Sequence, residues 1–252
     1  MMRVLLLILA LVSAPAAAEE VVLGLSRDEV AITTRFDGSE ILIFGAIKRE
    51  EPIPADSELD VIITLAGPSQ PVTVRRKARR FGIWINTDAV EVDAAPSFYA
   101  VAASGVLPEL LKDVEDLRHR ISINRAIRSV GAPETVTDSE SFTEALIRIR
   151  RENGLYQRLD DHVVVDQQTL FRTSVTMPAN LTEGAYATRI FLVRDGMVVS
   201  EKSTKIDVRK VGLERWLFTL SRQQPLIYGL LSLAIAIAAG WGASAVFRYI
   251  RA

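Results

Sequence analysis

The chain has 252 residues, of which 49% are hydrophobic and 24% are charged, and its formal net charge is −1. A dedicated nucleic-acid-binding protein is usually basic overall, so this balance argues against that class. The chain has no cysteine, which excludes disulfides, thiol catalysis, thiolate metal sites and covalent c-type haem attachment. Roughly 190 residues between its two apolar ends are enough to bury a core without disulfides.

The first apolar segment predicts a secretory signal peptide over residues 1–18. Arg3 is followed by an apolar run at 4–12, and the small residues 16–18 form a cleavage pattern before Glu19. The run is too short to span a bilayer, which favours a cleaved signal. An uncleaved anchor is the alternative interpretation.

Residues 19–104 show the pattern of short strands separated by turns. The segments 30–36 and 39–47 flank Asp37-Gly38, a dipeptide typical of a tight type I′ turn, so we expect them to pair as a hairpin. Further apolar segments follow at about ten-residue spacing, at 59–67, 71–76, 81–86 and 97–104. This spacing indicates an Ig-like β-sandwich type of region.

Two of these strands are separated by a dense cationic stretch. If the signal peptide exports the domain, this stretch does not meet genomic nucleic acid. It is then either a solvated turn between strands or a contact for anionic lipid headgroups or an acidic partner. The residues are Arg75, Arg76, Lys77, Arg79 and Arg80.

Residues 105–158 change to a helical period and predict a two-helix segment. The first helix begins near Pro108 and has one apolar face, which comprises Leu107, Leu110, Leu111, Val114, Leu117 and Ile121. Residues 131–133 break it. A capping box at 141–144 opens the second helix, and Asn153-Gly154 ends it.

Residues 159–210 return to strands and form a second β region. The predicted strands are 169–177, 185–193 and 197–208, with a turn at 194–196. Tyr186 follows a glycine at the head of a strand, which is typical of the tyrosine corner in Ig-like sandwiches. Whether the two β regions form one sandwich or two remains open at this level.

The chain offers few candidates for catalysis. Of its two histidines, His119 falls on the charged face of the first helix, where we expect it to be solvated. Asp160, Asp161 and His162 have metal-binding chemistry, but neighbours on a strand point to opposite faces. No nucleophile elbow, zinc-protease or phosphate-loop motif is present. We therefore predict no catalytic, metal or cofactor-binding residues.

The C-terminal segment predicts a membrane span. Residues 225–247 contain no charge and are long enough to cross the hydrocarbon core. Residues 211–224 form either a stalk or an interfacial helix before it, and 248–252 form a cytoplasmic tail. Small residues recur every four positions along the span, which is typical of a helix-packing face. They are Ser232, Ala236, Gly240 and Ser244.

A signal peptide followed by one span predicts a periplasmic N-terminal domain and a cytoplasmic C-terminus. The flanking charges favour the reverse orientation, because four cations precede the span and two follow it. Long domains are translocated largely regardless of charge, so the signal peptide carries more weight.

These features resemble a family of uncharacterised putative transmembrane proteins of alphaproteobacteria. The resemblance rests on the terminal segments, on VAITTRFDGSEILIFGAI at 30–47 and on FYAVAAS at 98–104. It implies no activity and no catalytic residues. It does imply a possible partner, a neighbouring permease similar to sulfite exporters.

We therefore expect a non-enzymatic accessory or binding protein in the inner (cytoplasmic) membrane, whose single helix docks against a multi-span permease. No cofactor and no nucleic acid is expected to bind. Two hypotheses from other classes remain. One is a membrane-anchored periplasmic hydrolase or metal-dependent enzyme around Asp161 and His162. The other is an envelope structural or assembly factor whose cationic stretch meets anionic lipid.

Overall fold

The computed structural model describes residues 20–26, 29–32, 38–49, 58–130, 136, 138–210 and 213–250. The predicted signal peptide at 1–18, Asp37 of the predicted turn and the predicted helix break at 131–133 lie outside these residues. The chain divides into two compact units. The first, called the β domain, runs up to Val30 and includes Asp37–Val208; the second, the helical unit, comprises Ala31–Phe36 and Arg209–Ala252.

A four-stranded antiparallel sheet forms the first layer of the β domain. Its order is β1 (Glu20–Leu25), β3 (Ser39–Lys48), β10 (Leu170–Met177) and β9 (Val164–Asp166). Burial alternates along β3 and β10, as expected for strands with one face against a core.

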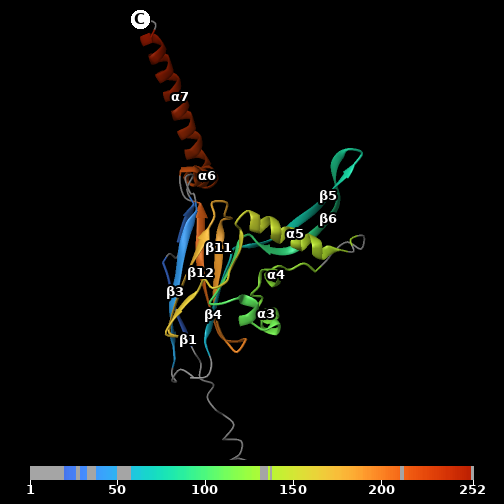
Figure 1. Ribbon diagram of the computed structural model, residues 1–252. Helices are drawn as coiled ribbons and strands as arrows, with labels where there is room; N and C mark the ends of the chain where they lie inside the picture. Colours follow the sequence, from blue (N-terminus) through green and yellow to red (C-terminus); the bar gives the residue numbers. More distant parts are fainter. Residues whose placement is uncertain are drawn as a thin grey trace, which may run out of the picture. The chain divides into compact units, whose positions relative to one another are not determined.

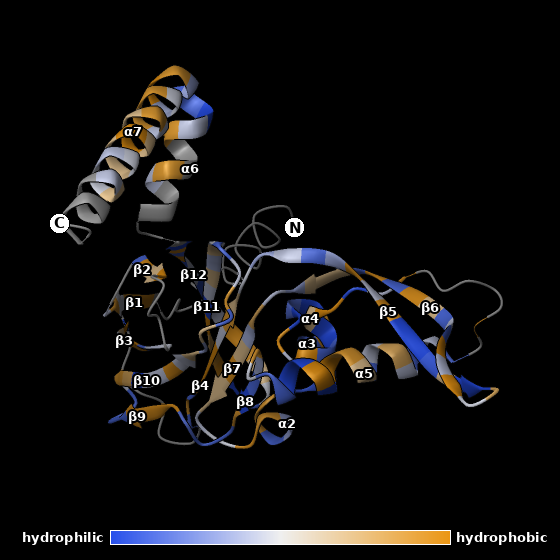
Figure 2. Ribbon diagram, turned by 90° about the horizontal axis from the view of Figure 1, so that it is seen from above, coloured by the Kyte–Doolittle hydropathy of each residue, from blue (hydrophilic) through white to orange (hydrophobic). Residues whose placement is uncertain are grey.

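A six-stranded sheet forms the second layer. Its order is β2 (Glu29–Ile32), β12 (Met197–Lys210), β11 (Gly184–Arg194), β4 (Asp60–Ala66), β7 (Tyr99–Ala103) and β8 (Tyr156–Leu159). The central strands β4 and β7 are buried on both faces. Figures 1 and 2 show the reason, because this sheet lies between the four-stranded sheet and the helices. The arrangement is therefore three layers deep around a shared core.

Both sheets combine strands from the two β regions, so these regions form one domain. The predicted hairpin at 30–47 is wrong, because β2 lies in the six-stranded sheet while β3 pairs with β1 and β10. The predicted turn at 194–196 is confirmed, with Asp195 and Gly196 at positive φ between β11 and β12. The Tyr186 hydroxyl donates to the Thr182 carbonyl at 2.7 Å.

The helical layer covers the outer face of the six-stranded sheet. It comprises α2 (Leu107–Leu110), α3 (Asp113–His119), α4 (Ile123–Ala126) and α5 (Ser139–Glu152). The predicted single helix from 107 to 121 is wrong, because the backbone becomes extended at Leu111. The Lys112 amide then donates to the Gly196 carbonyl at 3.1 Å, and Val114 and Leu117 remain exposed.

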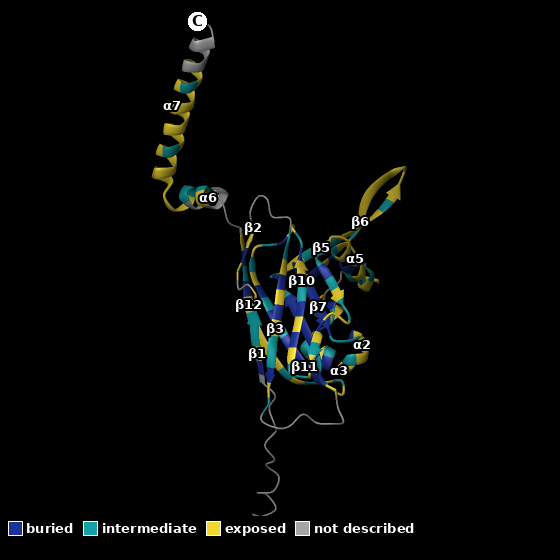
Figure 3. Cartoon of the chain, turned by 60° about the vertical axis from the view of Figure 1, so that its left-hand side comes forward, coloured by how far each residue is buried: buried dark blue, intermediate teal, exposed yellow. Residues whose placement is uncertain are grey.

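A two-stranded ribbon extends from the β domain. It pairs β5 (Ser69–Arg80) with β6 (Ile83–Pro96), and these strands belong to neither large sheet. The base of the ribbon is part of the core, because Val90 and Val92 are fully buried. Figure 3 shows that the outer part of the ribbon is exposed.

The helical unit contains α6 (Leu213–Gln223) and α7 (Pro225–Ile250), which contact each other. Pro225 opens α7, at a position where the missing amide hydrogen costs no helical bond. At 1.5 Å per residue, the 26 residues of α7 extend about 39 Å. The residues 248–250 of the predicted tail belong to this helix.

Candidate functional site

Helix α7 has the composition and exposure of a membrane span. The segment Pro225–Ser244 is 20 residues long and apolar, and none of it is buried. Large apolar side chains are exposed along it, with 83% of Leu226 and 72% of Trp241 accessible. Exposing such surface to water costs about 25 cal/mol per Å², whereas hydrocarbon accepts it. Within the described residues, α7 is the one helix suited to crossing a bilayer.

The predicted small-residue face lies on this exposed helix. Residues four apart share one face of a helix, so Ser232, Ala236, Gly240 and Ser244 form a continuous stripe. The Ser232 hydroxyl donates to the Gly229 carbonyl at 2.9 Å within the helix. A Cβ added at Gly240 would meet no described atom within 4 Å, so the stripe is open to an approaching helix.

The cationic stretch lies on the outer half of the ribbon. The Arg76 guanidinium donates to Asp138 Oδ2 at 2.6 Å and to Ser141 Oγ at 2.7 Å, and it lies 4.5 Å from the centre of the Phe142 ring. The hydrogen bond between Arg76 and Asp138 raises the pKa of the Arg76 guanidinium and lowers the pKa of the Asp138 carboxyl. Arg76 therefore fastens the ribbon to α5.

The remaining cations of this stretch are exposed. Among the described residues their side chains have no hydrogen-bond or salt-bridge partner, in contrast to Arg76. They are Arg75, Lys77, Arg79 and Arg80.

His119 belongs to a network of charged groups, so the expectation of a solvated side chain is wrong. Its Nδ1 lies 3.1 Å from Glu201 Oε2, its Nε2 lies 3.6 Å from Glu115 Oε2, and its ring meets Phe191 edge-on. The Arg189 guanidinium donates to the His119 carbonyl at 2.8 Å. These bonds connect α3 to β11 and β12, which gives His119 a structural role.

The acidic residues before β9 do not converge on His162. Asp160 forms a two-point salt bridge with Arg158 (Nε–Oδ1 3.0 Å, Nη2–Oδ2 2.8 Å) and accepts a bond from the Leu107 amide. The Arg158 hydrogen bond lowers the pKa of Asp160. Asp161 and His162 instead line an open hollow on the four-stranded sheet. Within the described residues, no group of three His, Cys, Asp or Glu side chains could hold a metal ion.

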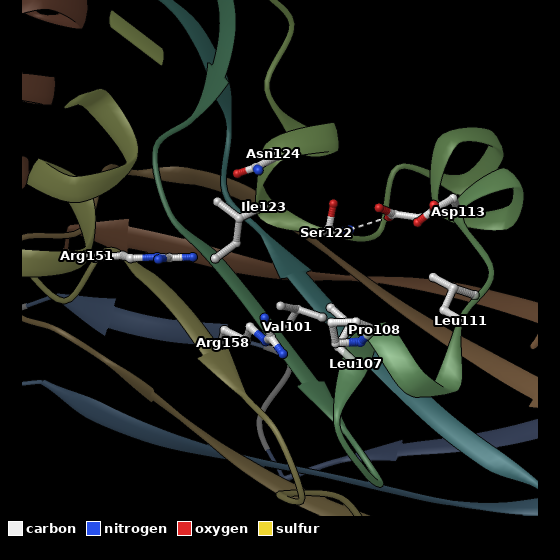
Figure 4. A pocket seen from close by; sticks show the side chains of 11 residues that line it. Val101, Leu107, Pro108, Leu111, Asp113, Ser122, Ile123, Asn124, Arg151 and Arg158 are labelled. Carbon is white, nitrogen blue, oxygen red and sulfur yellow. Dashed lines mark hydrogen bonds between the residues drawn. The ribbon is translucent and has the colours of Figure 1, made fainter. Parts of the chain in front are cut away.

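A pocket of about 180 Å³ lies between the helical layer and the edge of the six-stranded sheet. Figure 4 shows Arg151 from α5 and Arg158 from β8 pointing toward an apolar floor that includes Val101 and Ile123. Asp113 and Asp116 also line the pocket. The pocket is therefore apolar at its base and charged at its rim.

Two of the charged side chains at this rim form bonds within the fold. Asp116 Oδ1 accepts bonds from the Ile121 amide at 3.1 Å and the Ser122 amide at 2.7 Å, and Arg158 is held by Asp160. The Arg151 side chain is exposed and has no salt-bridge partner in the part of the chain that the structure describes. Arg151 is thus the group best placed to bind an anionic group.

A family model described as "Putative transmembrane protein (Alph_Pro_TM)" matches residues 20–249. The chain belongs to this family. The match begins with β1 and ends within α7, so membership of Alph_Pro_TM extends over the β domain, the ribbon and the apolar helix alike. Among curated proteins, none matches the sequence.

Proposed function

We propose that this member of the Alph_Pro_TM family is a single-pass accessory or binding protein of the inner membrane, with a periplasmic β domain and no enzymatic activity. The observation that carries the proposal is α7, a fully exposed apolar helix that follows a β domain with its own core. Membership of a transmembrane family supports the attachment to a membrane.

The size of the pocket supports recognition of a small group. Pockets for drug-sized ligands have about 300–1,000 Å³, and one water occupies about 30 Å³ of liquid. A volume of about 180 Å³ therefore suits a small anion or one side chain of a partner protein. The unpaired Arg151 at the rim favours a carboxylate or a similar oxyanion.

Several titratable side chains are engaged in bonds that hold the fold together, which supports a non-enzymatic role. Asp160 is held by Arg158, Asp116 accepts two backbone amides, and His119 lies between two carboxylates that connect secondary elements. Each of these bonds contributes to the fold, and moving a proton through any of them would disturb it.

We propose further that α7 docks against a multi-span membrane protein, and a permease similar to sulfite exporters is the first partner to test. Helices in lipid associate through close packing, because burying apolar surface brings no gain there. The small-residue stripe on α7 allows such an approach, and a larger side chain on the stripe would prevent it.

Affinity purification of the tagged full chain from gently solubilised membranes, followed by mass spectrometry, tests the docking. Ala236→Leu together with Gly240→Leu should remove a co-purified multi-span protein. The matched control is Ala234→Leu with Ala238→Leu, which places the same bulk on the opposite face of α7 and should leave the partner bound. Equal recovery with both double variants would rule out docking through the stripe.

The orientation has a separate test, because the chain has no natural cysteine. Val199→Cys on exposed β12 should react with a membrane-impermeant thiol reagent in intact spheroplasts, and Ala252→Cys should react only after lysis. The reverse pattern would refute a periplasmic β domain.

One observation keeps the hydrolase alternative open, since Asp161 and His162 share their open hollow with the hydroxyl-bearing residues Ser26 and Ser174. If this alternative holds, His162→Ala should abolish the hydrolytic activity without lowering Tm. We expect no functional loss, because our proposal places the working surfaces elsewhere.

A further inference from the structure

The tip of the β5–β6 ribbon exposes apolar side chains that no described residue covers. Phe81 is 106% exposed, Trp84 69% and Ile83 64%, although Val90 and Val92 at the base of the same ribbon are fully buried. Figure 2 shows hydrophilic residues along β5 in the projecting part, and Figure 3 shows this part exposed. Large apolar residues gathered at one projecting end indicate an interaction site.

The turn at the tip carries an aromatic residue where the backbone disfavours one. Phe81 and Gly82 have φ of 50° and 85°, so both central residues of this two-residue turn are left-handed. Such turns favour Asn-Gly or Asp-Gly, and the β11–β12 turn of this chain uses Asp195-Gly196. A bulky residue at positive φ is an outlier that stability does not explain, which favours a functional reason for Phe81.

Cations accompany the apolar side chains on both faces of the ribbon. Residues paired across an antiparallel ribbon share a face, so Arg79 lies beside Trp84, and Arg80 beside Ile83 on the other face. Arg75 and Lys77 follow further from the tip. The long stems of such residues lie along apolar surface while their charged ends reach a polar layer. An apolar end beside the cations of β5 therefore matches a bilayer interface.

We propose that the ribbon tip inserts into the interface of an anionic phospholipid bilayer. Phe81, Ile83 and Trp84 enter the boundary between headgroups and acyl chains, where aromatic rings are favoured. The unpaired cations Arg75, Lys77, Arg79 and Arg80 contact the lipid phosphates. The proposal holds for either orientation of the chain, so it stands apart from the proposed function.

Charge and connectivity favour lipid over a second copy of the chain. The cationic β5 edges of two copies would repel each other, which opposes pairing through that edge. The same chain carries α7, which is long and apolar enough to cross a bilayer.

Arg76 keeps the ribbon in a defined direction. It is the one described cation of the stretch that binds within the chain, to Asp138 and Ser141 at the start of α5. A fixed ribbon loses less conformational freedom on insertion than a free one, because part of that loss has occurred on folding.

The test uses the full chain in nanodiscs, with a single cysteine carrying an environment-sensitive fluorophore. Ile83→Cys reports on the tip, and Val199→Cys is the control on the exposed part of β12. With 30% phosphatidylglycerol in phosphatidylcholine, the tip probe should shift to the blue and be quenched by lipid-borne quenchers. In pure phosphatidylcholine, and at the control position, the probe should remain in water.

The charge contribution has a quantitative test. Each Lys or Arg near an anionic membrane contributes about fivefold to binding, so Arg79→Gln should lower the insertion equilibrium about fivefold. Arg125→Gln, an exposed cation on α4, should leave it unchanged. A tip probe that stays in water with anionic lipid would overturn the proposal. Equal burial with and without phosphatidylglycerol, or burial in detergent that grows with protein concentration, would overturn it as well.

Discussion

Alkaline pH should weaken the attachment of the helical layer to the six-stranded sheet through Tyr99. The Tyr99 hydroxyl donates to the Ile121 carbonyl at 2.6 Å in a fully buried position. Burial raises the pKa of Tyr99 from 10.0 to about 12, because the phenolate would lose its hydration. The folded state thus prefers the protonated form more strongly than the unfolded chain does.

The sign and the pH window follow from that difference. Below pH 10 both states are protonated and the contribution of Tyr99 to stability is complete. Between pH 10 and about 12 only the unfolded chain ionises, so the free energy of unfolding falls as pH rises. At 1.36 kcal/mol per pKa unit, the loss attributable to Tyr99 is about 3 kcal/mol.

Thermal unfolding of the purified full chain, followed by circular dichroism from pH 8 to 12, measures this loss. Tyr99→Phe removes the titrating group but leaves the Ile121 carbonyl unpaired, which costs about 2 kcal/mol at pH 8 and lowers Tm by about 4–8 °C. Its stability should then fall less steeply above pH 10 than that of the wild type. Parallel slopes for the two proteins would refute the argument. Tyr156, whose pKa burial also raises to about 12, should behave similarly when changed to Phe.

Three further changes test other parts of the structure. Gly45→Ala should destabilise the β domain by about 1–3 kcal/mol, because the added Cβ would lie 2.5 Å from an aromatic carbon and 2.6 Å from a backbone oxygen. Gly229→Ala is the control and should leave Tm unchanged, because no described atom lies within 4 Å of the Cβ added there. Phe81→Asn should slow amide exchange at the ribbon turn by relieving the left-handed strain, yet reduce lipid insertion. Below about pH 4, protonation of Asp138 should release Arg76. The folded-state pKa of Asp138 is lowered, so its contribution to stability is present at pH values above the unfolded-state pKa and is lost as pH falls. Faster amide exchange in β5 would report the release, and Arg76→Gln should abolish the pH effect.

Local sequence patterns predicted the mainly β fold and the long apolar C-terminal helix. They failed where distant contacts decided the outcome. Asp37-Gly38 has the composition of a hairpin turn, but β2 pairs with β12, which is distant in the sequence. The helical period from 107 to 121 gave no sign of the extended backbone at Leu111, after which the Lys112 amide donates to the Gly196 carbonyl.

The candidate surfaces divide in the same way. The cationic stretch was visible in the sequence because its members are consecutive, whereas its fastening through Arg76 to α5 was not. The pocket could not be predicted at all. Its lining comes from β7, the α2–α4 segment, α5 and β8, and neither Arg151 nor Arg158 stands out among the other cations of the chain.

The anchor and the ribbon tip would serve different purposes on one membrane. Insertion of a transmembrane helix is effectively irreversible, so α7 alone retains the chain and the tip adds nothing to retention. A tip tethered to its bilayer nevertheless experiences an effective concentration in the millimolar range, and even weak lipid affinity then keeps it inserted. Two attachment points restrict the rotation of the β domain over the membrane. If both attachments form, the domain would have less rotational freedom than a single flexible attachment allows.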